Sequence, residues 1–228
     1  MTTTTADLLP AIELETGQNP THAVLWMHGL GADGKDFVPI VDELSLPSTL
    51  RLRFVFPHAP MRSVSINRGM TMRAWYDYDI ADAYAGLHEN IASLRDSQRA
   101  IEALIARECQ RGVEPEHVVL AGFSQGGALA LQSGLRYPQK LAGIMALSCH
   151  VPALHTLAAE AHRANFSTPI FMAHGKSDNV IPMTFAAESR RQLLDSGYHV
   201  EWHEYPMAHS VCREEIADIR HWLQQVLV

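Results

Sequence analysis

The chain has 228 residues, with 47% hydrophobic and 19% charged residues, which suits one globular α/β domain. The formal net charge is −7 and no run of Lys or Arg occurs, which argues against nucleic acid as a partner because its binding depends on neutralising phosphates. No apolar stretch reaches the roughly 18 residues of a membrane helix, and no secretory signal is expected. Three scattered cysteines predict free thiols and a cytoplasmic protein.

Strand-like and helical patterns alternate along the chain after an N-terminal segment, residues 1–15, that we expect to be loosely ordered. Apolar, β-rich runs predict strands at Ala23–Met27, Arg53–Phe56, His117–Ala121, Leu141–Ser148, Pro169–Ala173 and Val200–Tyr205. Helical spacing of apolar residues predicts helices at Glu89–Gln110, Gly126–Tyr137, Met183–Ser196 and Glu214–Leu227. We therefore predict a single α/β domain over residues 1–228, with a mostly parallel central sheet, helices on both faces and no large lid domain.

The segment Met61–Leu87 interrupts this alternation. It is long, rich in aromatic residues and without a clean period. Long loops in compact domains tend to be functional or mobile, so we predict that this segment is a substrate-binding loop. A transient membrane contact through it stays open at this point.

The strongest chemical signal is a G-x-S-x-G pentapeptide, Gly122–Gly126, centred on Ser124. It follows a predicted strand and opens a predicted helix, which is the setting of a nucleophile elbow. Small residues on either side of the serine let the strand and the helix approach, and the helix N-terminus favours an oxyanion. Ser124 is therefore the predicted nucleophile, against the alternative of a glycine-rich turn with an incidental serine.

A serine nucleophile needs a base and a group that orients the base, and in this kind of fold they follow in the order Ser, Asp or Glu, His. Asp178 comes just after the strand Pro169–Ala173, and His209 lies between the last strand and the last helix. We predict that Asp178 orients His209, although Asp178 could instead cap a turn or a helix. Other candidates are less well placed: Asp195, Asp218, His155, His162, His199, His203 and His221.

An oxyanion hole needs two N–H donors. The backbone N–H of Gln125, the residue after the nucleophile, is one candidate. The loop His28–Gly31 follows the first predicted strand, and its glycines free the backbone to turn inward, so the N–H of Leu30 is the second. We expect His28 to hold this loop in place. No grouping of His, Asp or Glu has the spacing of metal ligands, so no metal is expected.

Six sequence blocks reinforce these assignments: HGLGADGKDF (28–37), FPHAP (56–60), WYD (75–77), GFSQGG (122–127), HGKSDNVIP (174–182) and YPMAHS (205–210). Together they resemble the acyl-protein thioesterase and small carboxylesterase (phospholipase/carboxylesterase) family. The resemblance implies a triad of Ser124, Asp178 and His209, oxyanion donors at Leu30 and Gln125, and Trp75 in the wall of the acyl groove. It also implies an enzyme without cofactor or metal that can form a homodimer.

This chain departs from the family pattern in two places. Ser148-Cys149-His150-Val151-Pro152 stands where many relatives carry Ser-Gly-x-x-Pro, and residues 61–72 match poorly. We expect Leu30 and four further residues to line the acyl groove, although each could equally belong to the core. The four are Met70, Met72, Trp75 and Val180.

These observations predict a serine carboxylesterase that hydrolyses short- to medium-chain acyl esters through an acyl-enzyme on Ser124. An acyl-protein thioesterase (depalmitoylase) or a lysophospholipase would use the same triad. A peptidase is a weaker alternative, and a catalytically silent binding module would keep the fold without the reaction. The predicted partner is a small acyl ester or thioester, not a nucleic acid.

Overall fold

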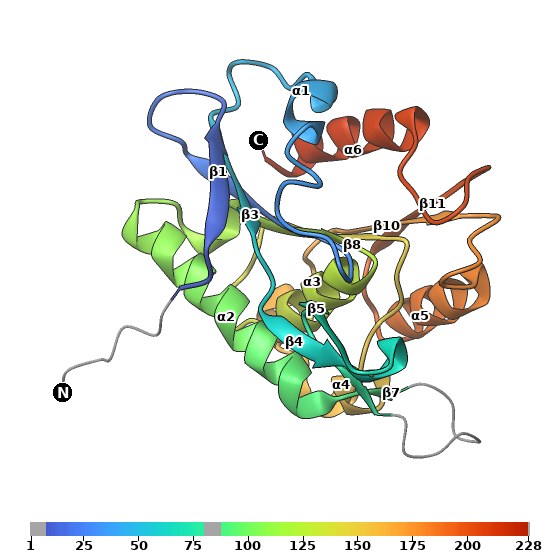
Figure 1. Cartoon of the computed structure of the whole chain (residues 1–228). Helices are drawn as coiled ribbons and strands as arrows, with labels where there is room; N and C mark the ends of the chain where they lie inside the picture. Colours follow the sequence, from blue (N-terminus) through green and yellow to red (C-terminus); the bar gives the residue numbers. More distant parts are fainter. Residues whose placement is uncertain (1–7, 80–87, 228) are drawn as a thin grey trace.

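A seven-stranded sheet forms the centre of the molecule, with the strand order β1-β3-β2-β8-β9-β10-β11 (Figure 1). The computed structural model describes residues 8–79 and 88–227. Only β1 runs antiparallel to its neighbour, β3; the other pairs are parallel, which confirms the predicted mostly parallel sheet. The strands are β1 (Ala11–Glu15), β2 (His22–Met27), β3 (Leu52–Pro57), β8 (Val118–Phe123), β9 (Gly143–Leu147), β10 (Ile170–Gly175) and β11 (Val200–Tyr205).

Helices cover both faces of this sheet, as predicted (Figure 1). One face carries α1 (Ile40–Leu44) and α6 (Arg213–Val226), whose apolar residues pack in one core cluster. The opposite face carries α2 (Ile91–Gln110), α3 (Gln125–Arg136), α4 (Leu154–Glu160) and α5 (Met183–Asp195) over a second cluster. Both faces of the sheet are therefore removed from water, which explains why its central strands are continuous apolar runs.

The strand order places a topological switch point between β2 and β8. From β2 the chain moves to β3 on one side, and later returns through β8 and continues outward on the other side to β11. In open α/β sheets, ligands bind outside the carboxyl ends of the strands at such a point. The loops that follow β2 and β8 begin with His28 and Ser124, so two predicted site segments meet there.

Three short elements differ from the sequence-based expectation. Residues 11–15, which we expected to be loosely ordered, form β1, while residues 1–7 lie outside the described part of the chain. Helices α1 and α4 were not predicted, because five and seven residues are too short for a recognisable helical period. Each of these elements depends on tertiary neighbours, since β1 pairs along β3 and the apolar residues of α1 and α4 pack in the two core clusters.

The segment 61–87 is more ordered than a plain loop. It contains the hairpin of β4 (Met61–Val64) and β5 (Met70–Arg73), joined through a short 3₁₀ helix, Ser65–Asn67. Further along, β6 (Tyr78–Asp79) pairs with β7 (His88–Glu89), which follows the segment. Residues 80–87 lie outside the described residues.

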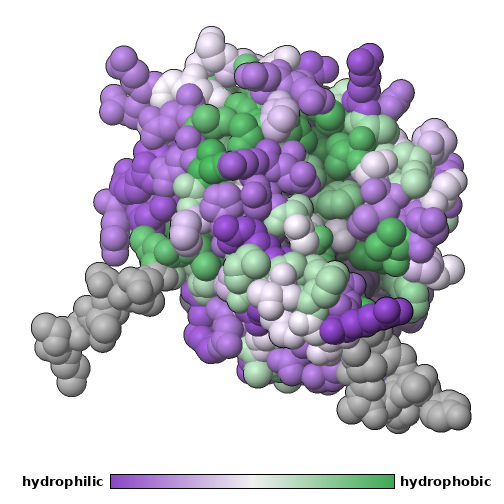
Figure 2. Space-filling model, in the orientation of Figure 1, coloured by the Kyte–Doolittle hydropathy of each residue, from purple (hydrophilic) through white to green (hydrophobic). Residues whose placement is uncertain are grey.

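The surface is mixed in polarity. On the face shown in Figure 2, hydrophilic residues cover much of the surface and apolar residues appear in separate groups. Among the helices of the described ranges, none is both long and apolar enough to cross a membrane. Two further 3₁₀ helices, Pro115–His117 and Arg163–Asn165, complete the structure.

Candidate active site

Ser124 occupies a strained turn between β8 and α3. Its φ of 55° and ψ of −123° lie in a region that a residue with a side chain rarely adopts, at a cost on the order of 1–3 kcal/mol. The surrounding backbone holds this geometry, because the Ser124 N–H donates to the Leu147 carbonyl at 2.8 Å and the Ser124 carbonyl accepts from the Ala128 N–H at 3.0 Å. This is the strand–turn–helix geometry of a nucleophile elbow.

The two glycines of the pentapeptide make this turn possible. A Cβ on Gly122 would lie 2.3 Å from the Gly126 carbonyl, and a Cβ on Gly126 would lie 2.3 Å from the Met27 carbonyl. Neither contact can be relieved by moving a side chain, since both involve backbone atoms. The glycines therefore let β8, α3 and the end of β2 approach, as the sequence analysis expected.

Asp178 and His209 form a hydrogen-bonded pair from two different loops. Asp178 follows β10 and His209 follows β11, and the His209 Nδ1–H donates to Asp178 Oδ2 at 2.6 Å. The other carboxylate oxygen accepts from the N–H groups of Val180 and Ile181, both at 2.9 Å. Burial alone would raise the pKa of Asp178, but these hydrogen bonds, led by that from His209, hold the pKa below its usual value. An ionised Asp178 leaves Nε2 of His209 free to accept a proton.

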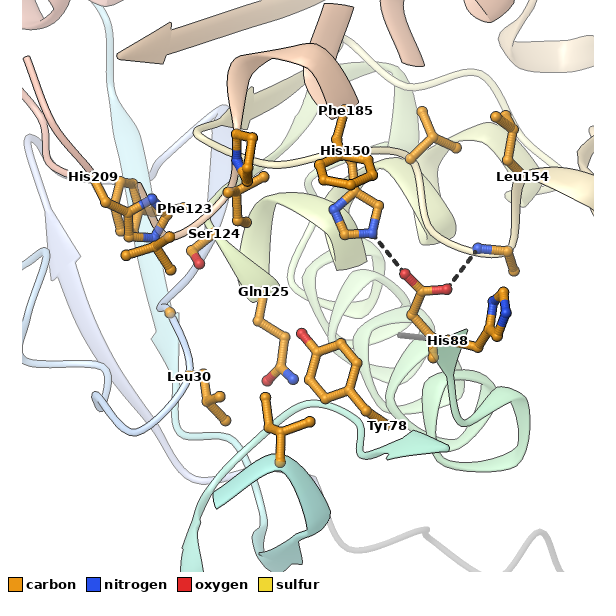
Figure 3. Close-up of a pocket in the computed structure, with 18 of the residues that line it drawn as sticks. Leu30, Tyr78, His88, Phe123, Ser124, Gln125, His150, Leu154, Phe185 and His209 are labelled. Atoms are coloured by element: carbon orange, nitrogen blue, oxygen red, sulfur yellow. Dashed lines mark hydrogen bonds and ion pairs between the residues drawn. The ribbon is translucent and has the colours of Figure 1, made fainter. Parts of the chain in front are cut away.

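Ser124 and His209 line the same cavity, on the side shown at the left of Figure 3. The ring of Phe123, the residue before the nucleophile, packs against the His209 ring with centroids 4.7 Å apart. The structure therefore brings the three predicted residues to one place: Asp178 orients His209, and His209 shares the cavity with Ser124.

The loop after β2 is held rigidly beside the nucleophile. The buried His28 ring donates from Nδ1 to the Gly29 carbonyl at 2.7 Å and accepts at Nε2 from the Ala59 N–H at 3.0 Å. Burial lowers the pKa of His28, which agrees with this neutral form. Trp75 Nε1 donates to the His28 carbonyl at 2.8 Å. The expectation that His28 holds this loop is confirmed, and the next residue but one, Leu30, lines the cavity with Ser124.

The side chain of Gln125 has a role that the sequence did not reveal. Its Oε1 accepts from the Trp75 N–H at 2.7 Å, and its Nε2 donates to the Tyr76 carbonyl at 2.8 Å. The backbone N–H of Gln125 is at the first position of α3, where helix N–H groups have no partner within the helix. Gln125 thus ties the WYD segment to the start of α3, beside the nucleophile.

The cavity has a volume of about 920 Å³, and apolar atoms form most of its surface. Val180 and Leu30 line it, as expected, but three other predicted groove residues lie elsewhere. Trp75 is completely buried and supports the His28 loop, so it is a core residue rather than part of the wall. Met70 is 60% exposed on the hairpin, and Met72 borders a separate surface depression. The hairpin carries both methionines away from the cavity, which their spacing could not show.

Sequence reasoning missed the residues that line the opposite side of the cavity. Phe185 and Leu154 come from α5 and α4, and Glu89 and His150 form a polar pair there (Figure 3). The only signal for them was the departure of Ser148–Pro152 from the family pattern. In that segment Cys149 is fully buried, and burial raises the pKa of its thiol.

Among the residues that the structure describes, no group of three or more His, Cys, Asp or Glu side chains could hold a metal ion. Fold and site together define a serine hydrolase of the α/β-hydrolase fold.

Comparison with known proteins places the chain more narrowly. The model of the family described as phospholipase/carboxylesterase matches residues 10–227, and this chain belongs to that family. Acyl-protein thioesterase 1 of Yarrowia lipolytica is 34% identical over 221 residues, covering 95% of this chain and 96% of that protein. Acyl-protein thioesterase 1 of Neurospora crassa is 36% identical over 227 residues, covering 96% and 91% respectively.

Solved structures agree with this assignment. Arabidopsis thaliana SOBER1 superposes with a TM-score of 0.84 at 30% identity, covering 91% of this chain and 99% of its own. Zea mays acyl-protein thioesterase 2 superposes with a TM-score of 0.82 over 96% of this chain and 99% of its own, and at 24% identity it shows the shared fold. The resemblance inferred from the six sequence blocks is confirmed, and so is the α/β-hydrolase fold.

Proposed function

We propose that this protein hydrolyses short- to medium-chain acyl esters through an acyl-enzyme on Ser124. The observation that carries the proposal is the convergence of three features on one cavity at the switch point of the sheet: a strained serine, a histidine, and a buried aspartate bonded to that histidine at 2.6 Å. A serine at its ordinary pKa is a weak nucleophile, and such an arrangement activates it.

In the proposed reaction Ser124 Oγ attacks the acyl carbonyl carbon while Nε2 of His209 takes the hydroxyl proton. Asp178 holds the imidazole in the tautomer that leaves Nε2 free and stabilises the imidazolium once it forms. The N–H groups of Leu30 and Gln125 donate to the oxyanion. His209 then gives its proton to the departing alcohol or thiol, and water attacks the acyl-enzyme by the same route, releasing the acid and restoring Ser124.

The shape of the cavity supports an acyl substrate. Its volume of about 920 Å³ is near the upper end of the range for small-molecule sites, and apolar side chains contribute most of its surface. Val180, Phe185 and Ile66 line it and are also partly exposed, at 63%, 60% and 37%, so apolar residues continue to the rim. This rim suits a lipid-like chain and supports a transient contact with a membrane.

A thioester substrate is the second candidate, and the names of the relatives favour it. The fungal relatives are acyl-protein thioesterases that align over nearly the whole chain. A thiolate leaves more readily than an alkoxide, so the same residues can act on either bond. Parallel assays with O-acyl and S-acyl substrates of equal chain length separate the two by their kcat/KM values.

The test is hydrolysis of p-nitrophenyl esters of increasing acyl length by the wild type and by Ser124→Ala. We expect the rate to fall by about 10⁴-fold or more in the variant. Ser63→Ala is the matched control, because Ser63 lies on the β4–β5 hairpin, where it donates to the Gly69 carbonyl, and should keep full activity. Equal rates for Ser124→Ala and the wild type would refute the proposal, and a fluorophosphonate probe that labels Ser124 supports it independently.

A further inference from the structure

The cavity has a second carboxylate–imidazole pair, on the side away from His209. His150 Nε2–H donates to Glu89 Oε1 at 2.6 Å, and Glu89 Oε2 accepts from the Ala153 N–H at 3.4 Å. Both residues line the cavity, although their side chains are only 28% and 13% exposed. Figure 3 shows His150 on the side away from His209, with Ser124 between the two histidines. A polar pair in a largely apolar wall has a cost in desolvation, and neither residue is needed for the proposed triad.

The position of Glu89 favours its charged form. It directly precedes Asn90, the N-cap of the 20-residue helix α2, so its carboxylate lies near the positive end of that helix dipole. Burial raises the pKa of Glu89, but the hydrogen bond and charge of His150, together with backbone N–H donors such as that of Ala153, hold the pKa below its usual value. An ionised carboxylate accepts hydrogen bonds and donates none. This side of the cavity therefore offers mainly acceptors.

The charges of the lining reinforce this character. Among the described residues that line the cavity, none is Lys or Arg. Apart from Tyr78, the ionisable lining residues are acids and histidines: Asp36, Asp79, His88, Glu89, His150, His155 and His209. A substrate group with a negative charge would meet repulsion here, whereas a hydroxyl or an ammonium group would find acceptors.

The proposed reaction at Ser124 determines which part of the substrate lies near Glu89 and His150. His209 protonates the leaving group, so the alcohol or thiol part lies on the His209 side of Ser124. The acyl part extends away from His209, toward the side where His150 lies (Figure 3). A sufficiently long acyl chain therefore ends near Glu89 and His150.

Resting on the proposed function, we propose that Glu89 and His150 are specificity residues that select acyl groups with a hydrogen-bond donor at the far end of the chain. The donor is a hydroxyl, bonded by His150 or Glu89, or an ammonium group, attracted by the Glu89 carboxylate. Acyl chains that end in a methyl group leave these acceptors unpaired, and chains that end in a carboxylate are repelled.

The experiment compares kcat/KM for p-nitrophenyl octanoate with its 8-hydroxy and 8-amino counterparts and with the mono-p-nitrophenyl ester of suberate (octanedioate), called the carboxy ester below. It adds the ten-carbon pair of decanoate and 10-hydroxydecanoate. In an apolar cavity a buried hydroxyl without a partner would lower kcat/KM by about tenfold. We expect the wild type to hydrolyse at least one ω-hydroxy ester as fast as its methyl-terminated parent or faster, and the carboxy ester slowest. A wild type that prefers both parents by tenfold or more would overturn the proposal.

Variants assign the preference to the pair. In the double variant Glu89→Leu with His150→Leu, the ratio of hydroxy to parent ester should fall about tenfold. Glu89→Gln keeps the shape of the side chain and removes its charge. It should reduce the rate for the amino ester most and raise the rate for the carboxy ester. This single substitution tests the proposal if the double variant does not fold. Unchanged ratios in the folded variants would overturn the proposal.

A matched control exists on β11, where His203 Nε2 lies 2.8 Å from Glu201 Oε1 in an exposed pair outside the cavity. Glu201→Gln and the double variant Glu201→Leu with His203→Leu should leave every ratio unchanged. The two proposals fail in different ways. Hydrolysis of octanoate that depends on Ser124 but shows no preference at the chain end refutes the specificity role alone, whereas hydrolysis that persists in Ser124→Ala refutes the proposed function.

Discussion

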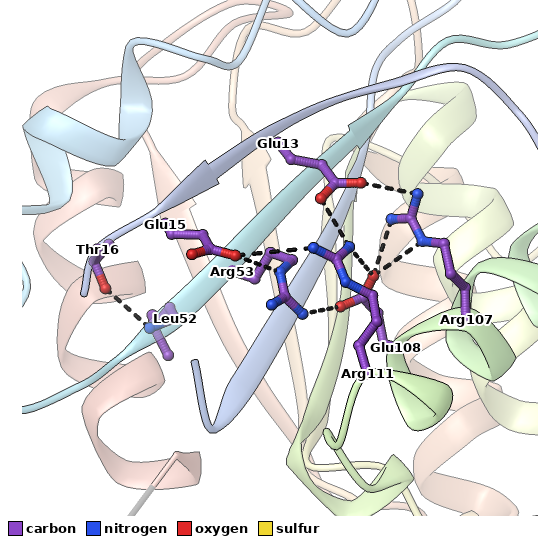
Figure 4. A network of polar contacts seen from close by, with 8 residues as sticks. All are labelled: Glu13, Glu15, Thr16, Leu52, Arg53, Arg107, Glu108 and Arg111. Carbon is purple, nitrogen blue, oxygen red and sulfur yellow. Dashed lines mark hydrogen bonds and ion pairs between the residues drawn. The ribbon is translucent and has the colours of Figure 1, made fainter. Parts of the chain in front are cut away.

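Two buried carboxylates, Asp178 and Glu108, have fully inaccessible side chains but very different partners. Asp178 accepts from one histidine and two backbone N–H groups at the carboxyl ends of the strands. Glu108, near the end of α2, lies among arginines from α2 and β3 (Figure 4). Arginine keeps its proton in proteins, whereas histidine can lose and regain one near neutral pH. The pair of Asp178 and His209 can therefore take part in proton transfer, whereas the arginine cluster around Glu108 can only stabilise the fold.

The cluster around Glu108 joins three elements. Arg53 of β3 lies 2.7 Å from Glu108, and Arg107 of α2 and Arg111, the C-cap residue of α2, lie at 2.9 and 3.1 Å. Glu13 and Glu15 of β1 extend the cluster toward solvent. The more exposed of these pairs contribute little by themselves, but Glu108 neutralises Arg53, whose side chain is only 8% exposed. The cluster thus anchors the edge strand β1 and its neighbour β3 to α2.

Asp178→Asn should have the largest effect on catalysis. The amide cannot hold His209 in the tautomer that accepts a proton, so kcat should fall by about 10⁴-fold. The thermal unfolding temperature should change little, because the hydrogen bonds can largely be kept. The measurement is steady-state ester hydrolysis beside a melting curve. Asp195→Asn is the control: Asp195 is an exposed residue of α5 paired with Arg191, and the substitution should leave kcat unchanged. A kcat for Asp178→Asn within tenfold of the wild type would contradict the assigned role.

Glu108→Gln should have the opposite profile. It removes the buried counter-charge of Arg53, which keeps only the partly exposed Glu15, and removing one partner of a buried pair costs about 3–5 kcal/mol in unfolding free energy. The kcat of the protein that remains folded should match the wild type. Denaturant unfolding measures the loss, with Glu13→Gln as the control, since Glu13 is 29% exposed and its replacement should cost about 1 kcal/mol or less. A Glu108→Gln protein as stable as the wild type would show that the cluster contributes no net stability.

A third buried carboxyl, Glu215 of α6, differs from Asp178 and Glu108 because burial is the main influence on its pKa. Burial raises the pKa of Glu215 to about 8, with a smaller opposing effect from the Cys212 N–H. Between about pH 4.5 and 8 the folded protein keeps a proton that the unfolded chain loses. Stability from this group is therefore complete below the unfolded pKa and falls as the pH rises through that window.

The substitution Glu215→Gln should remove this fall. Relative to the wild type, the variant should gain stability with rising pH, by about 3 kcal/mol at pH 8. Denaturant unfolding at pH 5 and pH 8 measures the difference, and comparison of the two proteins cancels the contributions of other titrating groups. Parallel pH profiles for variant and wild type would mean that Glu215 does not hold its proton in the folded state.

Features that depend on a few adjacent residues could be predicted from the amino-acid sequence. The six main strands and four longer helices follow from apolar periodicity, and the elbow follows from a pentapeptide whose glycines are forced by contacts of 2.3 Å. The predicted partnership of Asp178 with His209 is present because the carboxyl ends of neighbouring parallel strands, β10 and β11, meet at one edge of the sheet. Apolar periodicity and tight turns depend on residues that are close together in the sequence, so both can be predicted from it.

The residues that surround the substrate cavity could be identified only from the tertiary structure. Trp75, expected in the wall, is buried behind it, whereas Glu89 and His150, 61 residues apart, meet within it. The strand β1 likewise exists through its pairing with β3. No local pattern marks such contacts, because they depend on how loops from separate elements fold over the sheet. The catalytic residues therefore follow from short motifs, whereas the lining of the cavity depends on packing between segments that are distant in the sequence.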